Sequence, residues 1–177
     1  MSLARLVVPG NQRIITPFSH ESLMSKGLQE IDTGLGSNTW DTANKVGYYP
    51  FELAEPFTVF KVFTYNGTVV SGNWDLGVMD EAGARLFSSG STAQATTSDL
   101  QPVDITDYTL GEGRYFLAFG LDNATATTVR ANPTAAWMDF LGCKEQASAF
   151  PIPSTATFAA YTLGDVPLVG LIGVSTF

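Results

Sequence analysis

The chain has very little of the chemistry that most enzymes and metal proteins use. Its 177 residues include one histidine, His20, and one cysteine, Cys143. A single cysteine cannot form a disulfide within the chain, and one residue of each kind is too few for a zinc site built from histidine and cysteine. His20 lies between Ser19 and Glu21, but neighbours in sequence do not make the geometry of a catalytic triad. We therefore expect no catalytic residue and no metal.

The glycine and serine motifs of nucleotide and acyl chemistry are missing as well. Neither Gly-x-Ser-x-Gly nor Gly-x-x-x-x-Gly-Lys-Ser/Thr occurs, and the short Gly-x-Gly sequences at 34–36 and 111–113 lack the rest of a dinucleotide-binding fingerprint. We expect no cofactor and no enzymatic activity.

Charged residues are scarce and unbalanced. They make up 15% of the sequence, against roughly 25% in an average protein. Seventeen acidic residues and nine basic ones give a net charge of −8. Proteins that bind nucleic acid present a basic surface to the phosphates, so the composition indicates that nucleic acid is not a partner.

Long hydrophobic runs are also lacking. The longest, at 166–174, is interrupted by Pro167, Gly170 and Gly173, whereas a membrane helix needs about 20 apolar residues. Near the start, the apolar run at 6–8 is too short for the core of a signal peptide. We expect neither a membrane contact nor an export signal.

What the sequence does have is a strand pattern. β-Branched and aromatic residues, separated by turn residues, fill the region 46–131, which is typical of an all-β sandwich or barrel. Within 73–80, Trp74, Leu76 and Val78 occupy alternate positions, so we expect them on one buried face.

A tyrosine follows one of the predicted turns. Tyr115 comes just after Gly111-Glu112-Gly113, a spacing that resembles the tyrosine corner of sandwich folds, in which the hydroxyl bonds back to the preceding loop. We expect Tyr115 to be structural.

The hydrophobic pattern divides the chain into three parts. Residues 1–45 have apolar residues scattered among glycines and prolines and are predicted to form an extended N-terminal arm that contacts other subunits. Residues 46–145 are predicted to form an antiparallel β-sandwich of jelly-roll or Ig-like type. Residues 146–177 return to short, interrupted apolar runs and are predicted to be a C-terminal strand and tail segment. The expected fold class is therefore all-β.

Several strand and turn sequences between residues 49 and 130 share a further likeness. They are Tyr49–Phe51, Tyr65–Thr68, Ser71–Val78, Gly83–Leu86, Ser89–Gln94, Val103–Thr106 and Gly113–Ala118. Together they resemble a group of small β-sandwich proteins encoded by tailed bacteriophages and prophages. Such proteins are generally virion components, so the resemblance implies a structural role, with decoration or stabilisation of the capsid as the main prediction and a tail or baseplate role as an alternative.

The same resemblance implies partners and a location. The partners would be other virion proteins, from the capsid or tail, and copies of this chain in the particle. The protein would be made in the host cytoplasm and would reside in the virion.

The apolar residues of the arm need cover, either on the sandwich's own flank or on another subunit. We favour another subunit, because an ordered arm without a period of its own is a common way to extend an interface. The predicted subunit-contact residues are Leu6, Val7, Val8, Ile14, Ile15 and Phe18.

A glycan is the alternative partner. Trp40, Tyr48 and Tyr49 lie at the approach to the sandwich, and aromatic rings exposed on one surface can stack on sugar rings. These three are the predicted ligand-facing aromatics of a carbohydrate-binding module used for adhesion to a host surface. The competing interpretation is that they plug the open end of the core or lie in a protein interface.

Clustered carboxylates near turns raise the question of a calcium site. Asp75, Asp80 and Glu81 flank one predicted turn, and Asp99, Asp104 and Asp107 surround another segment. Neither group has the spacing of an EF-hand, and turn aspartates usually bond to their own backbone. We expect turn chemistry from them.

Overall fold

The computed structural model describes residues 12–17 and 36–175, and in this part of the chain the strands form three antiparallel sheets. The four-stranded sheet has the order β1 (Gln12–Ile15), β14 (Val169–Ser175), β4 (Phe57–Tyr65) and β8 (Leu100–Leu110). The seven-stranded sheet has the order β12 (Ala159–Ala160), β11 (Lys144–Gln146), β3 (Val46–Leu53), β9 (Gly113–Leu121), β5 (Asn73–Asp80) and β6 (Arg85–Ser88), with β7 (Thr92–Ala93) also paired to β5.

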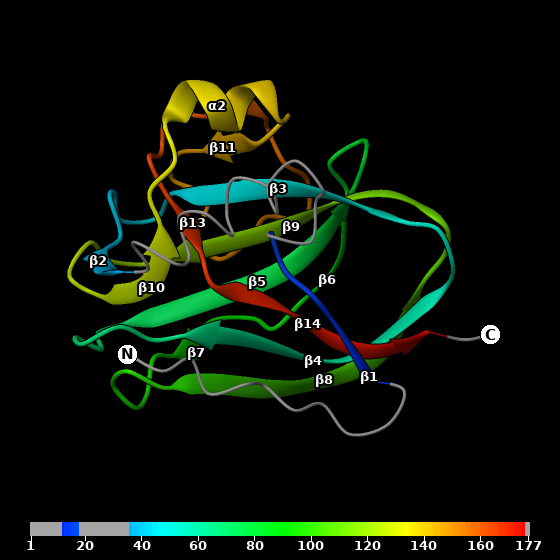
Figure 1. Cartoon of the computed structure of the whole chain (residues 1–177), viewed down its shortest axis with the longest axis horizontal. Helices are drawn as coiled ribbons and strands as arrows, with labels where there is room; N and C mark the ends of the chain where they lie inside the picture. The colour runs from blue at the N-terminus through cyan, green and yellow to red at the C-terminus, as the bar shows by residue number, and fades with distance from the viewer. Residues whose placement is uncertain (1–11, 18–35, 176–177) are drawn as a thin grey trace.

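The remaining elements are a small third sheet and a short helix. A three-stranded sheet has the order β13 (Val166–Pro167), β10 (Thr127–Ala131) and β2 (Gly36–Thr39). A short helix, α2 (Ala135–Phe140), lies beside β11 (Figure 1). The two larger sheets pack on each other, so the predicted antiparallel β-sandwich is confirmed.

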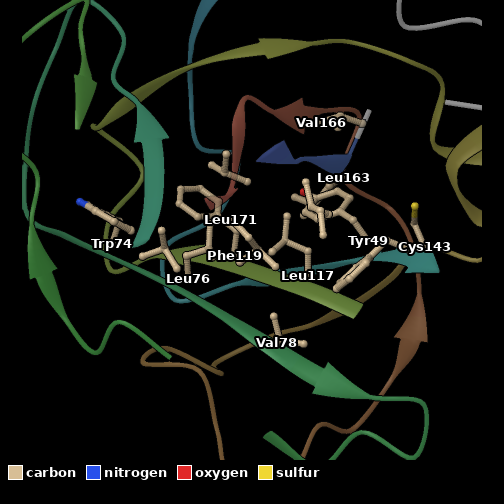
Figure 2. Packing of buried hydrophobic residues seen from close by; sticks show 14 of the residues in the cluster. Tyr49, Trp74, Leu76, Val78, Leu117, Phe119, Cys143, Leu163, Val166 and Leu171 are labelled. Atoms are coloured by element: carbon tan, nitrogen blue, oxygen red, sulfur yellow. The ribbon is translucent and has the colours of Figure 1, made fainter. Parts of the chain in front are cut away.

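The main core lies between the two larger sheets. Trp74, Leu76 and Val78 on β5 are fully buried there, as their alternation predicts. Across from them, Val59 on β4 and Leu171 on β14 belong to the same hydrophobic cluster. Figure 2 shows the side chains of β5, β9 and β14 converging in this layer.

The outer face of the seven-stranded sheet is covered too. Val46 and Tyr48 of β3, with Met79 of β5, are completely buried on that face against Ala149 and Ile152. The cover comes from the stretch between β11 and β12, which crosses the sheet. Strands buried on both faces show no alternation of apolar and polar residues, which explains the continuous burial of β3.

The predicted division at 145/146 is wrong. β14 lies inside the four-stranded sheet, between β1 and β4. The predicted C-terminal segment therefore contributes an integral strand to the sandwich. The glycines that interrupt its apolar run are sites of close approach. A Cβ on Gly170 would come 2.9 Å from the ring of Phe63, and one on Gly173 would come 2.7 Å from the ring of Phe57.

The division at 45/46 is wrong for the same kind of reason. β2 pairs with β10, β1 pairs with β14, and Trp40 is buried in the main core. The described residues before 46 therefore belong to the sandwich and not to a separate arm.

Tyr115 has the predicted structural role. Its hydroxyl donates a hydrogen bond to the carbonyl of Gly111 at 3.1 Å, which ties the start of β9 to the turn before it. Gly113 in that turn has a φ of +146°, a conformation that suits glycine. No helix in the described residues is long and apolar enough to cross a bilayer.

Candidate functional site

The three aromatics predicted to face a ligand are inside the protein. Trp40, Tyr48 and Tyr49 are at most 1% exposed. Trp40 packs edge-on against Phe119, with its indole N–H donating to the carbonyl of Lys45 at 3.1 Å. The ligand-facing prediction is therefore wrong for all three. Trp40 instead fills the core, and the two tyrosines lie on opposite, equally covered faces of β3.

Tyr49 belongs to a buried polar cluster. Its hydroxyl lies 3.2 Å from that of Tyr161, and burial raises the pKa of both phenols. Burial also raises the pKa of the neighbouring Cys143 thiol to about 12. A thiol in that state is a poor nucleophile. Close by, Arg130 forms an ion pair with the fully buried Asp165, and Tyr161 donates to the backbone carbonyl of that aspartate.

The predicted subunit-contact residues have mixed outcomes. Ile15 is 8% exposed and belongs to the main core, because β1 pairs with β14 of the same chain; its assignment to another subunit is wrong. Ile14, on the same strand, is half-buried and lines the cleft described next. Leu6, Val7, Val8 and Phe18 lie outside the described residues.

A cleft of about 290 Å³ opens at one end of the sandwich. It forms where β1, the end of β14 and the turn between β3 and β4 meet (Figure 1). Its polar residues are Arg13, Glu52, Glu55 and Ser175. Its apolar wall includes Ile14, Ile15, Leu53 and Phe57. The volume is close to the lower end of the 300–1,000 Å³ usual for small-molecule sites.

The polar side of the cleft is organised around Arg13. Its guanidinium forms an ion pair with Glu55 and donates to the hydroxyl of Ser175 at 2.7 Å. These three side chains come from β1, the β3–β4 turn and β14. The arginine side chain is 58% exposed and the Glu55 side chain 31%, and both residues line the cleft, so the pair is accessible to a ligand there. Such a pair can offer both N–H donors and carboxylate acceptors to a bound molecule.

Sequence reasoning missed this cleft. Its members lie at 13–15, 52–57 and 175, and the register that joins them is set by the pairing of β1 and β14. No local spacing connects these segments, and nothing in the sequence marks the last strand as a neighbour of the first.

A second exposed feature is an aromatic ledge, formed by Trp137 and Phe140 on α2. Their rings stack with centroids 5.6 Å apart, and Phe140 is 78% exposed. Met138 lies between them in the sequence. It is fully buried and anchors the helix. Asp139 and Lys144 form an ion pair at 3.2 Å beside the ledge. Trp137 is the one tryptophan that the structure leaves partly exposed among the described residues.

Three of the six carboxylates considered for a calcium site bond to backbone groups, whereas Glu81 and Asp104 form ion pairs with Arg114 and Lys61. Asp80 accepts from the N–H of Ala84 at 2.8 Å, Asp99 accepts from that of Leu100 at 2.8 Å, and the buried Asp75 accepts from that of Ile152 at 3.0 Å. Among the described residues, no group of three or more His, Cys, Asp or Glu side chains is arranged to hold a metal ion.

Comparison with known proteins adds little. No protein-family model matches the chain, and no curated protein matches it. A solved structure with some similarity is a fucose-binding module, SpX-3, of Streptococcus pneumoniae, with a TM-score of 0.33 and 15% identity over 71% of this chain and 91% of that one. Similarity at that level is too low to transfer a ligand or a site.

Proposed function

We propose that this protein is a non-catalytic binding module and that the end cleft takes a small polyhydroxylated ligand of the sugar class. The observation that carries this proposal is the composition of the cleft. Its lining combines apolar residues with Arg13, which is bonded to both Glu55 and Ser175.

A sugar ring matches both sides of this cleft. Its hydroxyls act as donors and acceptors at once, so a carboxylate and a guanidinium held together can each bond to neighbouring hydroxyls. Its C–H face is apolar and would lie against Leu53 and Ile14. Because the Arg13–Glu55 pair already exists in the protein, little side-chain entropy is lost on binding.

Calorimetric titration of the full chain with a panel of neutral hexoses and deoxyhexoses tests the proposal. At least one sugar should bind saturably, and Arg13→Ala should weaken it by about tenfold or more, as expected for a lost charge-assisted hydrogen bond. Lys144→Ala is the matched control, because Lys144 is also an ion-paired cation on a strand but pairs with Asp139, outside the cleft lining. Equal losses in both variants, or no binding by any sugar, would reject the proposal.

A structural role in a virion is the second candidate function. It is supported by the resemblance to phage β-sandwich proteins and by the aromatic ledge, since an exposed Phe stacked on a Trp suits a protein contact. Its test is the mass-spectrometric copy number of this chain in purified particles. A fixed high copy number that falls with Phe140→Ser would support this role, and absence from particles would exclude it.

A further inference from the structure

The charges that line the cleft do not cancel. Among the described residues, one arginine and two glutamates line it, which is a formal net charge of −1. Arg13 is occupied by Glu55, so it is already neutralised within the protein. The excess charge therefore belongs to Glu52.

Glu52 has no arginine or lysine bonded to it among the described ion pairs. Arg114 lies opposite it in the β3–β9 register, but its guanidinium binds Glu81 at 3.3 Å. Glu52 is exposed at the rim of the cleft. A carboxylate in that position attracts a cationic group on a ligand and repels an anionic one.

We infer that the cleft distinguishes sugars by charge and prefers those with a protonated amine, because the Glu52 carboxylate attracts the ammonium group. This inference rests on the proposed function, because it concerns the ligand of the same cleft. The neutralised Arg13 gives an acidic sugar no uncompensated cation to bind unless the sugar displaces Glu55. Amino sugars should therefore bind best, their neutral parents next and the corresponding uronic acids least.

The experiment compares three sugars of one stereochemistry at pH 7. Glucosamine, glucose and glucuronate form one set, and galactosamine, galactose and galacturonate form another. In low salt, each step in charge should change Kd by about two- to fivefold, as for exposed charges a few ångströms apart. In 1 M NaCl the steps should shrink, because the screening length falls to about 3 Å.

Glu52→Gln should reduce the ratio of amino-sugar to uronic-acid affinity towards one. Asp107→Asn is the matched control. It removes the same charge from an exposed position on β8, outside the cleft, and should leave the ratio as it is. If a neutral sugar binds but the three charge types bind equally, or the ratio survives Glu52→Gln, this inference is wrong and the proposed function stands. If no member of either set binds, and the neutral panel also fails, the proposed function itself is wrong.

Discussion

The carboxylate of Glu145 accepts a hydrogen bond from the backbone N–H of Leu163 at 3.0 Å. It also accepts from the N–H of Thr162 at 2.8 Å and from the Thr162 hydroxyl at 2.7 Å. Lys45 forms an ion pair with it at 3.0 Å, with both side chains at most 14% exposed. This one side chain thus joins β11, the residue before β3 and the segment that leads to β13.

Replacing Glu145 with alanine should therefore destabilise the fold by about 3 kcal/mol, because it leaves a nearly buried ammonium and two backbone donors without partners. Chemical denaturation at pH 7 measures the change. Glu112→Ala, an exposed glutamate in the β8–β9 turn, is the control and should have a small effect. Equal stabilities for the two variants would contradict the role assigned to Glu145.

The same residue predicts a pH dependence. Burial raises the pKa of Glu145, but the hydrogen bonds from Thr162, Lys45 and Leu163 outweigh burial, and the pKa lies below its ordinary value near 4.5. Below 4.5 the unfolded chain binds this proton more readily than the folded one, so the contribution is complete above pH 4.5 and is lost as the pH falls through the folded pKa. Glu145→Gln should show a shallower loss of stability in acid than the wild type. An unchanged acid slope would argue against this.

Asp75 secures the cover on the outer face of the seven-stranded sheet. Its carboxylate accepts from the N–H of Ile152 at 3.0 Å and from the Ser89 hydroxyl at 3.1 Å. Asp75→Ala leaves the buried Ile152 N–H unpaired and should cost about 1–3 kcal/mol. Hydrogen exchange should quicken most in residues 147–158. If exchange quickens evenly over the whole sandwich instead, Asp75 does not act locally.

Gly170 and Gly164 offer a matched pair of glycine substitutions in the last part of the chain. A Cβ at 170 would come 2.3 Å from the carbonyl oxygen of Ile15 and 2.9 Å from the Phe63 ring, whereas a Cβ at 164 meets nothing within 4 Å. Gly170→Ala should lower stability by about 1–3 kcal/mol, as overpacking does. Gly164→Ala should be close to neutral. Thermal melts of both variants compare them, and the reverse order would place β14 outside the sheet.

Trp74 should contribute to stability and not to ligand binding. It is fully buried in the main core, and its indole N–H has no hydrogen-bond partner among the described residues, so truncation removes packing alone. Trp74→Ala should cost about 3–5 kcal/mol, while Phe140→Ala, at the 78% exposed ledge, should leave the melting temperature almost unchanged. A stable Trp74→Ala variant that loses a ligand would overturn the assignment of this strand's faces.

Local patterns in the sequence predict those parts of the fold that depend only on residues close to one another in the sequence. The alternation of Trp74, Leu76 and Val78 identifies the inward face of β5, and the turn before Tyr115 identifies its bond to Gly111. Both signals lie within a few residues. The all-β class follows from the same kind of evidence.

Other parts depend on contacts between distant segments. Tyr48 and Tyr49 are adjacent and both buried, because the seven-stranded sheet is covered on both faces, and a pattern of alternation cannot reveal that. Gly170 breaks an apolar run in the sequence but allows close packing under Phe63. The cleft needs Arg13 next to Ser175, a juxtaposition that only the β1–β14 pairing creates.

Mapping of a bound sugar by NMR tests the central claim most directly. Backbone amide shifts of the full chain would be followed during titration with the neutral hexose panel and its amino derivatives. The proposed site predicts saturable shift changes at residues 13–15, 52–57 and 175, with little change at 135–142. Saturable changes centred on the aromatic ledge, or no saturable change with any of these sugars, would contradict a sugar site in the end cleft.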